Sequence, residues 1–177
     1  MKHKVCKSSI LVILFLAGAC MLALALSPSI ASAAVFTYDK KPAFSITYPN
    51  SWEADPENPF KVMFRVKDAV GIPVLDVQVL DIPNGVALAD IGKYYKKAIL
   101  DKEQSVDAEI ASNKQTTLKD GTKANEITLK YKWQSWLPLK ATILSVYKDN
   151  KWVYAAINQS VSSEPWTDVL YSLTFKK

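Results

Sequence analysis

The chain has 177 residues, of which 49% are hydrophobic and 22% are charged, and its formal net charge is +5. This length fits one domain with a substantial hydrophobic core. Part of the positive charge lies at the N-terminus, so that residues 34–177 carry 19 Lys+Arg against 17 Asp+Glu. The resulting balance of +2 is too small to favour nucleic-acid binding.

An export signal is predicted at the N-terminus. A basic start is followed by an apolar run over residues 10–26 and by Ala31-Ser32-Ala33, a small-residue cleavage site. Cleavage after Ala33 would leave residues 34–177 as a single exported domain, periplasmic or extracellular. Two alternatives stay open. The apolar run is close to the shortest length of a retained membrane anchor, and Cys20 follows small residues as lipid-attachment cysteines do.

The residue types outside this signal limit the chemistry that the domain can perform. Both cysteines and the single histidine lie within residues 1–33. Residues 34–177 therefore form no disulfide, lack the usual base for nucleophilic catalysis, and lack the usual ligands of zinc and copper. We expect no catalytic residue, no metal site and no cofactor. A small periplasmic hydrolase that uses carboxylates or a Ser–Lys pair is the alternative.

Strands are predicted by alternating hydrophobic residues and by valine-rich runs. Tight hairpin turns are predicted at Lys119-Asp120-Gly121 and at Asp149-Asn150, because these residues adopt positive φ readily. The strands on either side of Asp149-Asn150 are apolar on both faces, which indicates a central position in a sheet covered twice. The predicted strands are residues 35–38, 43–48, 60–66, 74–80, 114–118, 122–133, 140–148 and 151–158.

Two helices are predicted where the hydrophobic period changes. The longer one covers residues 86–104, with Asn84 as a cap near its start, and a short closing helix covers residues 164–173. Asp76 lies among apolar residues of the strand 74–80, and the alternation places its side chain on the outward face.

These elements predict an α+β domain in which helices cover a mainly antiparallel β-sheet meander. The element order resembles the PsbP-like superfamily. The matching features are the strand FSITYP closed by Trp52, the mid-chain helix, the hairpin LKDGTKANEITLKY and a last helix running into YSLTF. We expect the Trp52 indole to be buried at the end of the core. The resemblance implies an α/β/α sandwich that serves as an accessory or binding module rather than as an enzyme. Metal binding in photosynthetic members relies partly on histidines, which residues 34–177 lack, so no metal site is carried over.

The candidate contact site is the stretch YKWQSWLPLK, which places apolar residues in a link where polar turn residues are ordinary. Its apolar members are Trp133, Trp136 and Leu137. Its flanking cations are Lys130, Lys132 and Lys140. If the indoles are exposed, they mark a contact with a partner, a ligand or a membrane, and the lysines favour an anionic one. The alternative is that both indoles fold back as a lid over the end of the core.

The sequence thus predicts an exported, non-enzymatic accessory or binding protein of the bacterial cell envelope. We expect a monomer that engages an envelope protein, or an apolar or anionic small ligand. A membrane-anchored structural protein is the alternative if the apolar segment 10–26 is retained.

Overall fold

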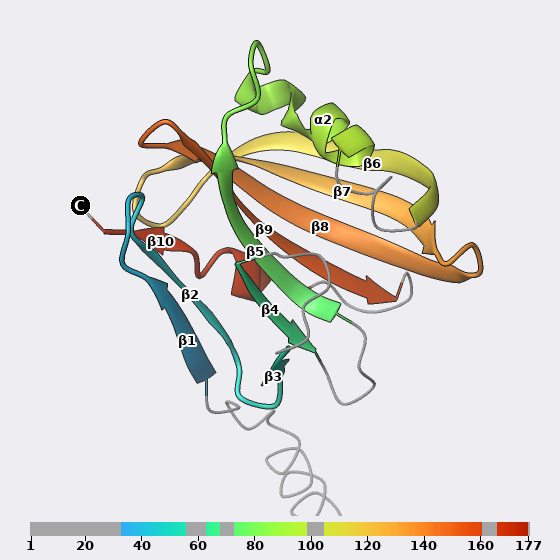
Figure 1. Ribbon diagram of the computed structural model, residues 1–177, viewed down its shortest axis with the longest axis horizontal. Helices are drawn as coiled ribbons and strands as arrows, with labels where there is room; N and C mark the ends of the chain where they lie inside the picture. The colour runs from blue at the N-terminus through green and yellow to red at the C-terminus, as the bar shows by residue number, and fades with distance from the viewer. Residues whose placement is uncertain (1–32, 56–62, 68–72, 99–104, 161–165, 177) are drawn as a thin grey trace, which may run out of the picture. The chain divides into compact units, whose positions relative to one another are not determined.

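The protein is described by a computed structural model that covers residues 33–55, 63–67, 73–98, 105–160 and 166–176 (Figure 1). The chain divides into two units, Met1–Ala31 and Ser32–Lys177, and the description below concerns the second. Residues 1–32, which include the apolar run and all but the last residue of the predicted export signal, lie outside the described residues. No helix among the described residues combines the length and the apolar character needed to cross a membrane.

A seven-stranded antiparallel sheet is the largest element of this unit (Figure 1). Its strand order is β3-β4-β5-β9-β8-β7-β6, so β3 and β6 are its two edge strands. The strands are β3 (Glu53–Ala54), β4 (Phe64–Lys67), β5 (Pro73–Asp81), β6 (Ser105–Thr117), β7 (Lys123–Trp133), β8 (Leu137–Lys148) and β9 (Lys151–Ser160).

A second, three-stranded sheet has the order β1-β2-β10. Its strands are β1 (Ala33–Tyr38), β2 (Phe44–Pro49) and β10 (Thr174–Phe175). The described helices are short: η1 (Leu88–Asp90), α2 (Ile91–Ala98) and α3 (Thr167–Leu170). The domain is therefore dominated by antiparallel sheet, as predicted, with less helical cover than expected.

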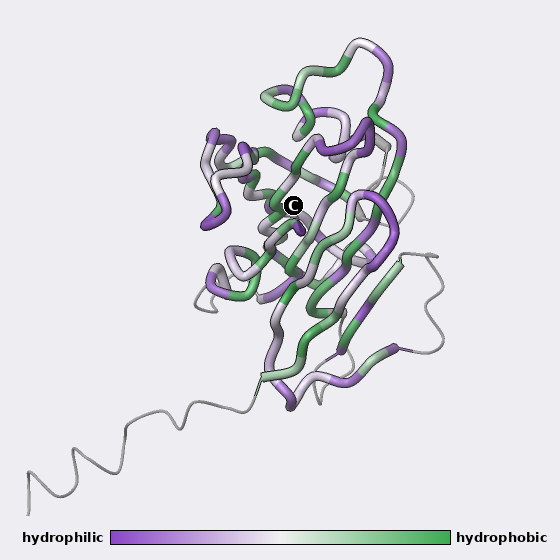
Figure 2. The backbone as a smooth tube through the Cα atoms, turned by 90° about the vertical axis from the view of Figure 1, so that its left-hand side faces the viewer, coloured by the Kyte–Doolittle hydropathy of each residue, from purple (hydrophilic) through white to green (hydrophobic). Residues whose placement is uncertain are grey.

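Two hydrophobic clusters lie on opposite faces of the seven-stranded sheet. The first joins β2, α3 and β10 to that sheet, and it includes the fully buried Phe44 and Ile46. The second lies beneath α2, where Ile91 and Tyr95 pack with Trp152 and its neighbours. Hydrophobic stretches of the chain run through the centre of the molecule, and hydrophilic stretches concentrate at its turns (Figure 2).

Several local predictions are confirmed. Asp149 and Asn150 both have positive φ (51° and 58°) in the turn between β8 and β9, and Gly121 has φ 86° between β6 and β7. Strand β9 is buried along eight of its ten residues because β5 and β8 flank it and both of its faces are covered. Trp52 is 7% exposed and packs edge-on against Trp166, with ring centroids 5.3 Å apart.

Other local predictions are wrong. Asn84 caps no helix, because it lies in a turn with Gly85 (φ 71°) and the helical segment begins at Leu88. The predicted strand 114–118 exists, but its predicted start is wrong, because it is the end of β6, which begins nine residues earlier at Ser105. Among the described residues of the predicted closing helix, only Thr167–Leu170 are α-helical, and the chain then turns into β10. Residues 99–104 of the predicted long helix lie outside the described residues.

Candidate partner-binding site

The stretch singled out from the sequence forms the tip of the β7–β8 hairpin. Trp133 at the end of β7 pairs with Leu137 at the start of β8, so three residues make the turn. Two of them, Gln134 and Ser135, have positive φ (51° and 67°), and the N–H of Trp136 donates to the carbonyl of Trp133 (3.3 Å). The tip is thus a closed hydrogen-bonded turn.

The structure separates the two tryptophans of this turn. Trp133 and Leu137 are partly buried and pack against the cluster beneath α2, so these two side chains extend the core. Trp136 is 69% exposed, the highest value among the large hydrophobic residues that the structure describes. The lid interpretation therefore fits Trp133, and the contact interpretation fits Trp136.

The backbone conformation of the tip and the exposure of Trp136 both reduce the stability of the fold. Gln134 and Ser135 occupy a left-handed backbone region that suits glycine, and each such residue costs about 1–3 kcal/mol. Trp136 leaves most of a large apolar surface in water. Functional sites often break local folding preferences, and a strained turn that exposes an aromatic side chain is typical of them.

The three predicted lysines lie on one face of this hairpin. The ladder places Lys130 opposite Lys140, and Lys132 follows two residues after Lys130 on the same side of β7. Carboxylates accompany them on the neighbouring strand β6. Asp107 forms an ion pair with Lys132 (2.7 Å), and Glu109 lies directly opposite Lys130 in the ladder.

This arrangement changes the electrostatic prediction. Three lysines and two carboxylates leave a local balance of only +1, so the charge no longer favours a strongly anionic surface. Apolar groups adjoin the same row, because Lys132 lies between Val106 (38% exposed) and the exposed Pro138 in the β6–β7–β8 ladder. An exposed indole therefore lies beside small apolar groups and mixed charges, and protein–protein interfaces commonly combine a tryptophan anchor with a polar rim.

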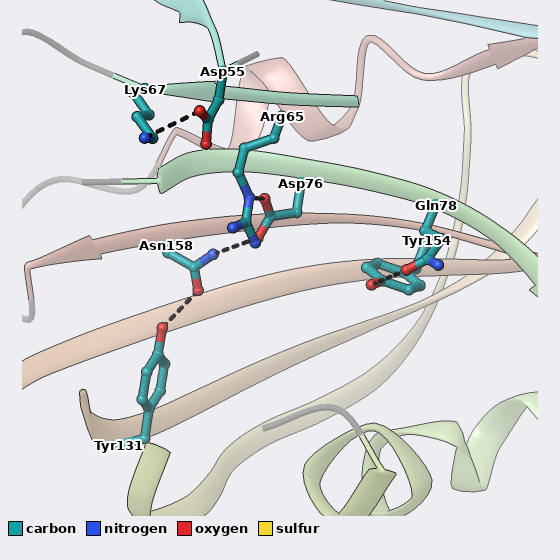
Figure 3. Close-up of polar contacts among 8 residues, drawn as sticks. All are labelled: Asp55, Arg65, Lys67, Asp76, Gln78, Tyr131, Tyr154 and Asn158. Atoms are coloured by element: carbon teal, nitrogen blue, oxygen red, sulfur yellow. Dashed lines mark hydrogen bonds and ion pairs between the residues drawn. The ribbon is translucent and has the colours of Figure 1, made fainter. Parts of the chain in front are cut away.

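A buried network of polar side chains, which the sequence did not predict, crosses the seven-stranded sheet. Asp76 was expected on an outward face, and this is wrong, because it is 2% exposed and forms a buried ion pair with Arg65 on β4 (Figure 3). Both faces of β5 are covered, so the alternation along that strand has no outward side. Burial is the largest influence on the Asp76 carboxyl and raises its pKa from 3.8, although Arg65 favours the ionised form.

The ion pair continues into a line of hydrogen bonds across the sheet (Figure 3). The Asn158 amide donates to the second oxygen of Asp76 (3.2 Å), and the Tyr131 hydroxyl donates to Asn158 (2.7 Å). One signal could have revealed this array. Arg65 is the sole arginine of the chain, set in an apolar strand among 21 lysines, and arginine suits buried carboxylate pairs better than lysine does.

The polar groups of this array bind one another, as those of a structural network do. The described residues include no group of three His, Cys, Asp or Glu side chains placed to hold a metal ion. The absence of catalytic residues and cofactors stays a prediction.

Comparison with known proteins identifies the fold. No protein-family model matches the chain, and no curated protein matches it either. Among solved structures, the solution structure of cyanobacterial PsbP (CyanoP) from Synechocystis sp. PCC 6803 matches with a TM-score of 0.61 and 16% sequence identity. The match covers 85% of this chain and 96% of that one. The chain therefore has a PsbP-like fold, as the sequence resemblance predicted.

Proposed function

We propose that this chain is an exported, non-enzymatic accessory protein that binds a protein partner of the cell envelope through the tip of its β7–β8 hairpin. The observation that carries the proposal is the exposure of Trp136 on a strained, closed turn. The PsbP-like fold supports an accessory role, and the N-terminal sequence pattern supports export.

A protein partner fits the tip better than a lipid surface does. Anionic membranes attract uncompensated basic clusters, whereas Asp107 and Glu109 offset most of the charge of the lysines here. A single tryptophan anchor in a rigid turn, with a rim of mixed charges, is typical of an interface hot spot. The closed turn also limits the conformational entropy that the loop loses on binding.

Site-specific photocrosslinking tests this proposal. A photoreactive residue at Gln134 is expected to form an adduct with one envelope protein, whereas the same residue at Asn150, in the other tight hairpin, is expected to form none. Trp136→Ala should abolish the adduct and weaken binding of the purified partner about 30-fold, the effect of losing roughly 2 kcal/mol.

The control separates binding from folding. Val35→Ala removes apolar surface from a residue that is 58% exposed on β1, so it should leave both the adduct and the affinity unchanged. Trp136→Ala should shift the free energy of unfolding by no more than about 0.5 kcal/mol. An adduct that persists in Trp136→Ala, or one that forms equally from position 150, would refute the hairpin tip as the contact site.

A further inference from the structure

Strand β6 forms an edge of the seven-stranded sheet and is unusually long. It has 13 residues, whereas strands of globular proteins have about 5–6, and it pairs only with β7. The opposite edge, β3, has two residues. Along its outer side, β6 presents backbone N–H and C=O groups that have no ladder partner among the described residues, and such an edge is a template for a further strand.

The first half of β6 is protected against such pairing. The ladder is irregular between Val106 and Glu109 and again between Ile110 and Ser112, and Asp107 has φ 56°. Bulges and charges of this kind discourage edge pairing.

The second half of β6 lacks that protection. Residues 112–117 pair with β7 without a register shift, and Lys114 is their only charged side chain. Lysine on an edge ordinarily repels a further strand. Here the Lys114 ammonium binds the Glu126 carboxylate on β7 (2.9 Å), so its charge is directed inward and compensated. Six consecutive residues of the edge are therefore regular and electrically neutral.

A hollow of about 450 Å³ adjoins this segment, a size within the range of binding pockets. It is lined by residues 87–89 before α2, residues 115–117 of β6, and Lys123 and Ala124 of β7. Gln115 and Thr117 lie on the same side of the sheet as Ile127, which packs beneath α2. A side chain on that face of an added strand would therefore project toward the hollow.

Lys123 determines the charge of this hollow. It is exposed, it lies opposite Thr117 in the ladder, and it makes no ion pair within the part of the chain that the structure describes. The other lining residues carry no charge: they are the polar Gln115, Thr116 and Thr117 and the apolar Ala87, Leu88, Ala89 and Ala124. A carboxylate is the complementary group.

We propose that residues 112–117 of β6 bind an extended peptide segment of a protein partner as an added strand, with an Asp or Glu side chain of that segment beside Lys123. Main-chain hydrogen bonds to the edge would supply affinity, and the hollow would select the acidic side chain. This surface is independent of the hairpin tip. The two lie at opposite ends of β7, roughly 33 Å apart at 3.3 Å per residue.

The test is a selection of random twelve-residue peptides displayed on phage, fused so that they present no free C-terminal carboxylate. The full chain is the target, and Lys123→Glu and Lys119→Glu are compared. Lys119 is exposed in the adjoining turn and lies outside the hollow, so its substitution changes the net charge equally. The wild type and Lys119→Glu should enrich acidic peptides, whereas Lys123→Glu should not.

A synthetic, C-terminally amidated version of one selected peptide then provides the affinity. Its binding should weaken at least about tenfold with Lys123→Glu and less than threefold with Lys119→Glu. Replacing its acidic residue by the corresponding amide should weaken binding to the wild type but not to Lys123→Glu. Hydrogen exchange of residues 112–117 should slow when the peptide is bound.

Three results would overturn the proposal. Selection could yield peptides without acidic enrichment, or protection from exchange could fall on residues 133–138 instead of β6. The edge could also be covered by a second copy of the chain, which light scattering would show as a dimer with slow exchange in residues 112–117 before any peptide is added.

Discussion

The buried ion pair between Arg65 and Asp76 permits a quantitative test of what stabilises this domain. The two side chains are only 1% and 3% exposed. Asp76→Ala would leave the guanidinium of Arg65, which stays protonated, in the interior without the Asp76 carboxylate. Removing one partner of a buried ion pair costs about 3–5 kcal/mol, a large share of the roughly 5–15 kcal/mol that stabilises a typical domain.

The double substitution Arg65→Met/Asp76→Leu should be milder than Asp76→Ala. It removes both charges and replaces them with apolar side chains of comparable size, a change that is often neutral. Part of the remaining cost comes from the Asn158 amide, which loses its acceptor on Asp76 and contributes about 1–3 kcal/mol. The double variant should therefore be more stable than Asp76→Ala by about 2 kcal/mol.

Urea denaturation at pH 7, followed by circular dichroism, measures these free energies of unfolding when the m-values of the variants agree. The matched control is Lys151→Met/Asp81→Leu. Asp81 on β5 and Lys151 on β9 likewise form an ion pair between neighbouring strands, but their side chains are 88% and 42% exposed. That exposed pair should contribute less than about 1 kcal/mol. The reasoning is refuted if Asp76→Ala costs under about 1 kcal/mol, or if the double variant is the less stable of the two.

Three further substitutions test other parts of the fold by the same measurement. Trp52→Ala should cost about 3–5 kcal/mol because the indole is buried, and a loss below about 1 kcal/mol would contradict that packing. Gly92→Ala should destabilise the domain by about 1 kcal/mol, since the new Cβ would lie 3.1 Å from the Ile127 side chain and this overlap outweighs the gain in helix propensity. In an Ile127→Ala background, which removes the overlap, Gly92→Ala should become stabilising. Burial of Asp120 alone would raise its pKa, but hydrogen bonds from backbone N–H groups, including that of Phe175, lower it below 3.8 overall. Asp120 therefore stabilises the fold fully above pH 3.8 and progressively less as the pH falls through its lowered pKa. Asp120→Asn should be less stable than the wild type at pH 6, and the difference in free energy of unfolding should shrink toward pH 2. A difference that does not change with pH would refute this assignment.

The candidate contact site shows how far a local pattern reaches. The cluster of apolar residues between two strands was visible in the sequence, and the structure places its tryptophans on one closed turn. The pattern could not distinguish Trp133 from Trp136, because both are large aromatics three residues apart. Only the register of β7 with β8, which directs Trp133 toward the core and leaves Trp136 at the tip, separates them.

The sequence by itself determined the strand pattern, the tight turns and the burial of Trp52, because hydrophobic alternation and turn preferences act over a few neighbouring residues. Only the tertiary structure decided that Asp76 is buried, that carboxylates compensate the hairpin lysines, and that β6 is an edge. These outcomes depend on which strands lie side by side and on what covers each face. Residues far apart in the chain set that pairing, so no local pattern contains it.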